Sequence, residues 1–218
     1  MDILLTLVDF IVHLDHHLAD LIADYGGWTY GILFAIIFIE TGVVVLPFLP
    51  GDSLLFVAGA FAARGQFALA TLMGLLTLAA ILGNTSNYWI GRRLGPQVFQ
   101  WQDARFFNRA AFDKTHAFYE KHGAITIILT RFLPFMRTFS PFVAGVAAMT
   151  HTRFQFYNIL GGVLWVVSLC LAGYWFGNIA WIKNNLTVVI LALIIIPALP
   201  TVIVAAREWL AARARRAV

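Results

Sequence analysis

The sequence predicts an all-α integral membrane protein built as an inverted repeat, in which each copy is a re-entrant helical hairpin followed by a transmembrane helix. Hydrophobic residues make up 61% of the 218 residues and charged residues only 12%, which excludes an ordinary soluble domain. Short motifs recur in order after 86 or 87 residues: Leu46-Pro47-Phe48 with Leu133-Pro134-Phe135, Phe56–Gly59 with Phe142–Gly145, and Tyr88–Gly91 with Tyr174–Gly177. In each copy, prolines interrupt an apolar stretch that also carries ionisable residues, which is typical of transporter sites.

The N-terminal segment, residues 1–25, has the pattern of an amphipathic helix. Aspartate and histidine residues recur every three or four positions between Asp2 and Asp24, and leucine and isoleucine fill the other face. A helix of this kind is expected to lie in the membrane interface. The segment lacks a basic start and a small-residue cleavage site, so we do not expect a cleavable signal peptide.

The first repeat is expected to cover residues 28–94. The apolar run Trp28–Ile39 is about 18 Å long as a helix, too short for a hydrocarbon core of about 30 Å. A second short run, Ser53–Ala63, follows, with Asp52 or Ser53 as its N-cap. The residues expected to break the hairpin between the runs are Pro47, Pro50 and Gly51. Residues 68–91 then predict a full-length span.

The second repeat, residues 123–178, is expected to fold in the same way. Ala124–Phe132 is a short apolar arm that ends before Pro134. Ser140 followed by Pro141 predicts the start of the second arm, because serine caps helices and proline favours the first helical position. Residues 154–177 predict the next span. A last transmembrane helix is expected over residues 186–208, followed by a basic tail at 209–218.

The basic residues predict the orientation of the chain. Under the inverted-repeat topology, eleven of the fifteen lysines and arginines fall on one side, and only Arg64 and Lys183 fall on the other. The basic side is therefore expected to be cytoplasmic, with the interfacial connector at residues 95–122 and the C-terminus. An alternative is that each hairpin arm crosses the membrane fully. Labelling at Arg64 and Thr150 distinguishes the two, since only the inverted hairpins place these residues on opposite sides.

Four ionisable residues fall inside the predicted hairpins. Glu40 and Asp52 belong to the first hairpin, and Arg131 and Arg137 to the second. A charge at the bilayer centre costs roughly 2.5–3.5 kcal/mol, so these groups need partners. One interpretation is a structural salt-bridge lock between the repeats. The other is a phosphate site, because the guanidinium fork grips phosphate oxygens and stays charged.

The second interpretation also predicts proton coupling. The helix starts near Ser53 and Ser140 are expected to add free N–H groups for the anion. An anion that displaces a carboxylate from arginine removes the interaction that keeps the carboxylate charged, so the carboxyl group takes up a proton. Glu40 is the expected proton carrier, and Asp52 is either a gate on the arginines or a plain helix cap. Asn84, Asn87 and Asn158 are expected to form hydrogen bonds between helices.

The order of these motifs resembles the DedA family over nearly the whole chain. The matching residues are Glu40-Thr41, Pro47 to Asp52, Asn87-Tyr88, Gly91, Arg131 to Pro134, Arg137, Pro141, Ala144-Gly145, Asn158 and Gly161. The resemblance implies an inner-membrane protein with two facing re-entrant hairpins. It also implies translocation of undecaprenyl phosphate or phospholipids, with links to the proton motive force and to small oxyanions. The family's functional acids fall on Glu40 and Asp52, and its functional arginines on Arg131 and Arg137.

The sequence therefore predicts a proton-coupled carrier of a lipid phosphate, with undecaprenyl phosphate as the first candidate. The alternatives are an uncoupled phospholipid scramblase and a carrier of a small oxyanion. A membrane enzyme is not expected, because Ser140 has no histidine at a matching depth to activate it. No cofactor, metal or nucleic-acid partner is expected, and a homo-oligomer is left open.

Overall fold

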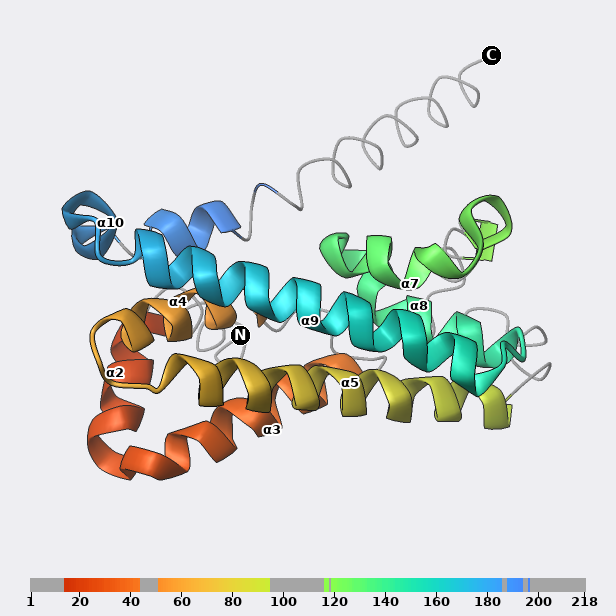
Figure 1. Cartoon of the computed structure of the whole chain (residues 1–218), viewed down its shortest axis with the longest axis horizontal. Helices are drawn as coiled ribbons and strands as arrows, with labels where there is room; N and C mark the ends of the chain where they lie inside the picture. Colours follow the sequence, from red (N-terminus) through yellow and green to blue (C-terminus); the bar gives the residue numbers. More distant parts are fainter. Residues whose placement is uncertain are drawn as a thin grey trace, which may run out of the picture.

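The computed structural model describes residues 14–43, 51–94, 116–117, 119–185, 188–193 and 196, and every regular element among them is helical (Figure 1). The first half contains α2 (Leu14–Tyr25), the 3₁₀ turn η1 (Gly26–Trp28), α3 (Thr29–Gly42), α4 (Gly51–Ala63) and α5 (Leu69–Leu94). The second half contains η3 (Gly123–Ile125), α7 (Thr126–Leu129), η4 (Thr130–Phe132), α8 (Pro134–Val146), α9 (His151–Phe176) and α10 (Ala180–Asn184).

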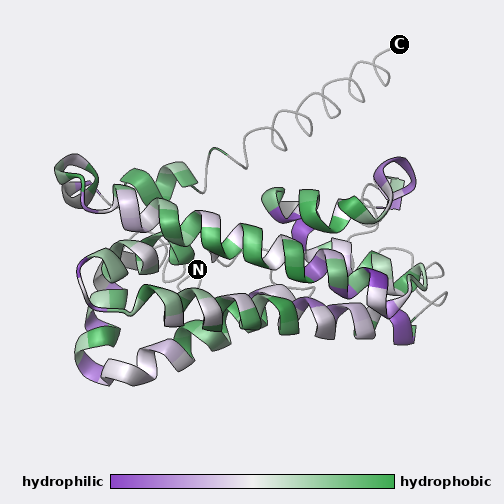
Figure 2. Cartoon of the chain, viewed as in Figure 1, coloured by the Kyte–Doolittle hydropathy of each residue, from purple (hydrophilic) through white to green (hydrophobic). Residues whose placement is uncertain are grey.

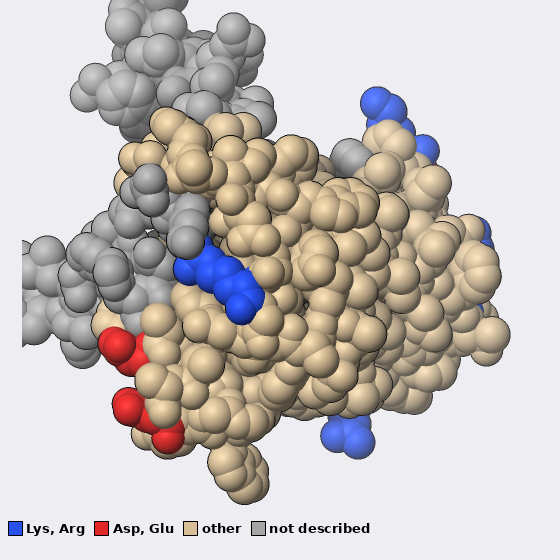
Figure 3. All heavy atoms as spheres, turned by 60° about the vertical axis from the view of Figure 1, so that its left-hand side comes forward, with Lys and Arg blue, Asp and Glu red and all other residues tan. Residues whose placement is uncertain are grey.

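Among the described residues, three stretches are long and apolar enough to cross a membrane: His17–Gly42, Leu69–Leu94 and His151–Phe176. The first of them is divided at η1, where Gly26 has a φ of +50° and the chain turns from α2 into α3 (Figure 1). Hydrophobic residues line the middle of α9, and hydrophilic residues gather at both ends of the molecule (Figure 2). Figure 3 shows a face on which charged side chains are few and separated by uncharged surface. The all-α membrane class is thus confirmed.

The two copies run in opposite directions. The turn from α4 into α5 lies at one end of the molecule and the start of α9 at the other, so the two long helices are antiparallel (Figure 1). The second arm of each hairpin packs mainly against the long helix of the other copy, α4 on α9 and α8 on α5. The position of the hairpins relative to a bilayer, and hence their re-entrant character, stays a prediction.

The duplicated glycines explain why the second arm of each hairpin packs on the long helix of the other copy. A Cβ on Gly59 of α4 would collide with the Cys170 carbonyl of α9. A Cβ on its repeat equivalent, Gly145 of α8, would collide with the Tyr88 carbonyl of α5. Glycine is needed where two helix backbones approach this closely. The main apolar core lies between α3, α4, α5 and α9, and it includes Leu33, Ile37, Leu55, Leu72 and Val166.

The start of the second arm differs from the prediction. Helix α8 begins at Pro134, after an extended Leu133 (φ −115°, ψ 105°), and Pro141 lies inside the helix. Pro134 therefore is a hairpin break, and the prediction of Pro141 as a break and helix start was wrong. Ser140 is the better N-cap residue, but Leu133 is the residue that takes the extended backbone that precedes a helix-starting proline.

An internal proline leaves the carbonyl of the fourth preceding residue, here Arg137, without its helical donor. Two side chains add hydrogen bonds to neighbouring carbonyls of α8. Asn87 Nδ2 donates to the Thr138 carbonyl at 2.8 Å, and the Tyr119 hydroxyl donates to the Ser140 carbonyl at 3.0 Å.

The start of α4 also differs from the prediction. The helix begins at Gly51, so Asp52 and Ser53 lie within its first turn and neither is the N-cap. The Asp52 carboxylate forms an ion pair with another helix, which is stronger than a local cap. Pro47 and Pro50 lie outside the described residues, as do residues 1–13 and 95–115, most of 186–208 and the basic tail.

The described part of the N-terminal helix has one buried and one exposed side, whereas its place in the membrane interface stays a prediction. In α2, Leu18 is buried against the core, whereas Asp20 and Asp24 are exposed. Trp28, just beyond its end, is 80% exposed. The apolar side of this helix thus packs on the protein and its acidic side faces outward.

Candidate functional site

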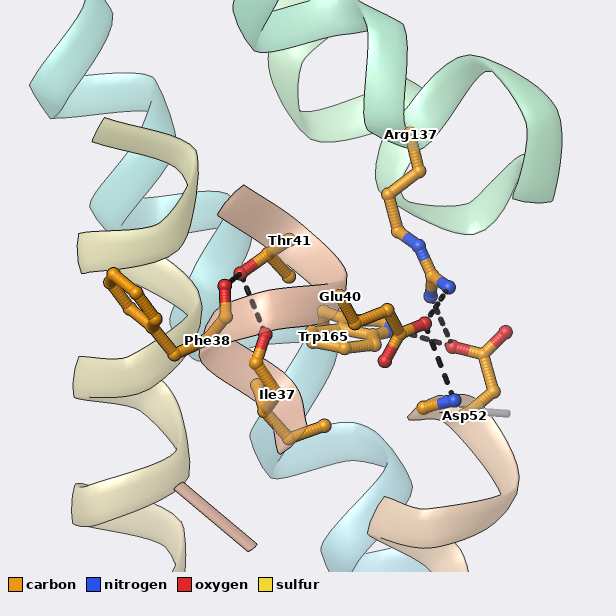
Figure 4. A network of polar contacts seen from close by, with 8 residues as sticks. Ile37, Phe38, Glu40, Thr41, Asp52, Arg137 and Trp165 are labelled. Atoms are coloured by element: carbon orange, nitrogen blue, oxygen red, sulfur yellow. Dashed lines mark hydrogen bonds and ion pairs between the residues drawn. The ribbon is translucent and has the colours of Figure 1, made fainter. Parts of the chain in front are cut away.

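The predicted charges of the first hairpin meet one arginine of the second. Glu40 lies near the end of α3 and Asp52 in the first turn of α4, so the two arms of the hairpin bring their carboxylates together. Figure 4 shows Arg137 extending from α8 towards both. Residues that are 97 and 85 positions apart in the chain therefore form one polar cluster.

Arg137 bridges the two acids. Its Nη2 lies 2.5 Å from Glu40 Oε1, and its Nη1 lies 2.7 Å from Asp52 Oδ1. Glu40 and Arg137 are buried, whereas the Asp52 side chain is 25% exposed. Charge-assisted hydrogen bonds of this kind are strong, but they hold a buried pair together only while both partners remain.

Glu40 has a second bond to the start of α4. The Gly51 N–H donates to Glu40 Oε1 at 3.3 Å, and Glu40 Oε2 has no hydrogen-bond partner among the described residues. A Cβ on Gly51 would collide with the Glu40 carboxyl group. Gly51 therefore lets the carboxylate approach the positive N-terminal end of α4.

Trp165 of α9 completes this side of the cluster. Its Nε1 donates to Asp52 Oδ1 at 2.8 Å. Its ring centroid lies 5.0 Å from Arg137 Cζ and 6.0 Å from Arg131 Cζ, within cation–π range of both. The sequence analysis missed this residue. The available signal was an indole in the middle of a span, where its N–H needs a buried partner rather than the interface.

Arg131 is held differently from Arg137. It is 2% exposed, and its Nη2 donates to Asn158 Oδ1 at 2.6 Å and to the Asn158 carbonyl at 3.2 Å. Within the described part of the chain, its Nε and Nη1 have no hydrogen-bond partner and no carboxylate forms an ion pair with it. Both acids pair with Arg137, so ion pairs do join the two repeats, but they do so through one arginine, and Arg131 takes no part in them.

A glycine leaves room for the Arg131 side chain, and asparagine side chains hold that side chain in place. A Cβ on Gly161 would lie 3.1 Å from Arg131 Cδ, so only glycine leaves full room for the side chain. Asn158 also accepts a hydrogen bond from Asn84 Nδ2 at 3.1 Å and donates to the Ile81 carbonyl and to Gln155 Oε1, each at 3.1 Å. The predicted hydrogen bonds between helices are confirmed for Asn84 and Asn158, and also for Asn87, whose Nδ2 donates to the carbonyls of Thr41 and Thr138.

The two predicted serines lie in different surroundings. Ser53 is fully buried next to Asp52 in the chain, and its hydroxyl has no partner among the described residues. Ser140 lies 2.9 Å from the Tyr119 hydroxyl, which donates to the Ser140 carbonyl. Burial raises the pKa of Tyr119, so its hydroxyl stays protonated as a donor. Ser140 is thus engaged by Tyr119, while Ser53 has a free hydroxyl.

Comparison with known proteins agrees with the motifs. The VTT domain family model matches residues 49–175. The chain is 50% identical to the protein DedA of Escherichia coli K12 over 205 residues, which cover 93% of this chain and 94% of that protein. It is 44% identical to an uncharacterized membrane protein of Mycobacterium leprae (78% of this chain, 76% of that protein) and 39% identical to the inner membrane protein YqjA of E. coli K12 (70% and 69%).

No solved structure was found to match the chain. The family model covers more than half of the sequence, and the identity to DedA extends over nearly all of it. The chain therefore belongs to the DedA family of VTT-domain membrane proteins.

Proposed function

We propose that the chain is a proton-coupled carrier that moves a lipid phosphate, undecaprenyl phosphate in the first instance, from the outer to the inner leaflet of the inner membrane. The observation that supports this most is Arg131. A buried guanidinium with two unpaired nitrogens and no carboxylate partner among the described residues is suited to an anionic ligand. Arginine is also the preferred partner for phosphate oxygens.

The coupling follows from the charges of the cluster. Glu40, Asp52, Arg131 and Arg137 together carry no net charge when all are ionised. A phosphate that binds at Arg131 adds negative charge beside two carboxylates that already share Arg137. Uptake of a proton by a carboxyl group restores the balance. Glu40 is the proposed acceptor, because its Oε2 has no partner that the proton would displace.

The outer surface of the long helices can accommodate a lipid tail. Large apolar side chains remain exposed along α5 and α9: Leu78, Leu82, Phe156, Ile159, Leu160, Val163 and Leu164. A polyprenyl chain can stay in the bilayer against this surface while the phosphate enters the arginine site. The free-energy cost of crossing the membrane is then that of the charged headgroup, because the tail stays in the bilayer.

The decisive experiment is reconstitution into liposomes that contain undecaprenyl phosphate or phosphatidylethanolamine in parallel, with an imposed pH gradient. We expect flux of undecaprenyl phosphate that follows the gradient and is lost in Arg131→Gln. Equal flux of phosphatidylethanolamine without pH dependence would instead identify a scramblase. Inhibition by inorganic phosphate alone, with no need for a lipid tail, would identify an oxyanion carrier.

A further inference from the structure

Two polar contacts outside the arginine cluster are related to each other by the repeat. Arg92 Nη1 donates to the Met149 carbonyl at 3.0 Å. Asn178 Nδ2 donates to the Ala63 carbonyl at 3.4 Å. The 86-residue offset of the repeat relates Arg92 to Asn178 and Ala63 to Met149. Equivalent residues of the two repeats therefore make equivalent contacts, one in each of the two oppositely directed copies.

The two contacts lie at opposite ends of the molecule. Arg92 is in the last turn of α5, and it reaches the turn between α8 and α9. Asn178 follows the end of α9, and it reaches the end of α4. The ends of α5 and α9 point in opposite directions (Figure 1). Each contact thus joins the end of a long helix of one copy to the second hairpin arm of the other copy. The Arg92 contact lies where the α5–α8 interface ends, and the Asn178 contact lies where the α4–α9 interface ends.

The two contacts differ in strength. At the Arg92 end, the Tyr88 hydroxyl donates to the same Met149 carbonyl at 2.5 Å and accepts from Arg92 Nη1 at 2.7 Å. Tyr88 is fully buried and its ring stacks on Phe154 at 4.3 Å. At the other end, the equivalent Tyr174 is 36% exposed and forms no hydrogen bond within the described part of the chain. Three short bonds therefore hold one end and a single long bond holds the other.

The turn at the Arg92 end is also strained. Ala148, which precedes Met149, has a φ of +53° and is the one described non-glycine residue in this left-handed region. The turn after α4 takes its positive φ at Gly65, where it costs little. A strained alanine persists only where the surrounding contacts hold it, and the bonds to Met149 supply those contacts.

We infer that these contacts are the two gates of an alternating-access carrier: Tyr88 and Arg92 close one end of the path to the arginine cluster, and Asn178 closes the other. In an inverted repeat, the second access state arises when the two copies exchange conformations, so equivalent contacts break and form in turn. The unequal contacts mean that this structure holds the Arg92 end closed, the end that the basic residues predict to face the cytoplasm. The inference rests on the proposed carrier function but not on the identity of the lipid.

The test measures access to a single cysteine and needs no substrate. Ser53→Cys places a thiol beside Asp52, in a background in which the only native cysteine, Cys170, is replaced by alanine. A membrane-impermeant thiol reagent is applied to right-side-out and inverted vesicles. We expect faster labelling from the Asn178 end than from the Arg92 end.

The double substitution Tyr88→Phe with Arg92→Asn removes the tyrosine hydroxyl and the guanidinium from the Arg92 end. It leaves an asparagine there, as at the Asn178 end. Labelling from the Arg92 end should then rise about tenfold, because at least two hydrogen bonds are lost from the closed state. The matched control is Arg93→Asn, which removes the neighbouring exposed cation and should leave labelling unchanged. An unchanged rate, or an equal rise from both sides, would overturn the inference.

Asn178→Arg tests the same inference by adding a contact, and so does not depend on a loosened protein. It supplies the residue of the stronger end next to Tyr174 and should slow labelling from the Asn178 end severalfold. Labelling that stays as fast as before would also count against the gates. Because lipid flux is measured separately, altered labelling without transport of undecaprenyl phosphate would reject the proposed substrate and keep the gates.

Discussion

At the scale of residues, the most important contact is that of Arg137, which forms ion pairs with both carboxylates of the first hairpin. Arg137 bonds to Glu40 and Asp52, so the hydrogen bonds of Arg131 within the described part of the chain go to the amide and carbonyl of Asn158. A neutral amide orients a guanidinium without cancelling its charge. Asn158 is therefore the residue that keeps Arg131 both fixed and available to an anion.

Asn158→Asp separates a structural from a functional role for Arg131. The new carboxylate would lie in the place of Oδ1, 2.6 Å from Arg131 Nη2, and would act as a permanent counterion. We expect the free energy of unfolding to change by less than about 2 kcal/mol, because the new ion pair is offset by the loss of the Asn158 Nδ2 hydrogen bonds to the Ile81 carbonyl and to Gln155 Oε1. Transport of lipid phosphate should fall at least about tenfold, because the anion must compete with a carboxylate.

Thermal unfolding in detergent and flux in liposomes measure these two effects. Arg131→Gln should lose the same flux for the opposite reason, since the cation itself is gone. Wild-type flux in Asn158→Asp would remove Arg131 from anion binding.

Glu40→Gln tests the proposed proton acceptor. The amide oxygen can still accept from Gly51 and Arg137, so the hairpin should form, but the side chain can no longer exchange a proton. We expect lipid flux that no longer responds to an imposed pH gradient. Glu120→Gln, which changes an exposed acid, is the matched control and should keep the response. If Glu40→Gln transports with an unaltered pH dependence, the proton is carried elsewhere.

At the scale of elements, the sequence predicted the long helices α5 and α9 to within a few residues, whereas α8 starts seven residues before the expected Pro141. The long helices were predictable because prolines, glycines and apolar run lengths act locally, as along α5 and α9. The sequence did not predict which proline starts α8, because Ser140-Pro141 carries the better local signal, serine being a preferred N-cap and leucine a poor one. The choice is made by tertiary contacts such as that between Tyr119 and Ser140.

The composition of the cluster was also predictable, whereas its pairing was not. Four charges in broken apolar stretches must meet, since each is costly alone in a membrane. Which acid meets which arginine depends on the packing of α4, α8 and α9, as does the place of Trp165 between Arg131 and Arg137. No spacing in the sequence carries that information.

The close helix crossings give a prediction about stability. Gly145→Ala would press a methyl group on the Tyr88 carbonyl and the Arg92 N–H, which are backbone atoms and cannot rotate away. We expect a loss of about 1–3 kcal/mol in the free energy of unfolding. Gly74→Ala is the matched control, because nothing lies within 4 Å of its Cβ position and it lies in the interior of α5.

This control should be neutral or stabilising by up to about 1 kcal/mol, since alanine favours the helix. Thermal unfolding of both variants in the same detergent compares them directly. Equal melting temperatures would mean that α5 and α8 do not approach each other as described.

At the scale of the whole molecule, the antiparallel arrangement of α5 and α9 predicts opposite exposure of the two hairpin turns. Arg64 follows the end of α4, and Thr150 precedes the start of α9, at the other end of the molecule. Arg64→Cys and Thr150→Cys, each in the Cys170→Ala background, should react with an impermeant reagent from opposite sides of the membrane. Reaction from the same side would replace the re-entrant hairpins by arms that cross fully.

The exchange of partners between the two halves has a consequence for biogenesis. Asp52 leaves the ribosome 85 residues before Arg137, and Glu40 leaves it 97 residues before. Until the second half emerges, the first hairpin has neither its counterion nor the α9 surface against which α4 packs. A nascent chain that stops after α5 would thus hold two buried carboxylates without a counterion, and we expect the two halves to mature as one unit.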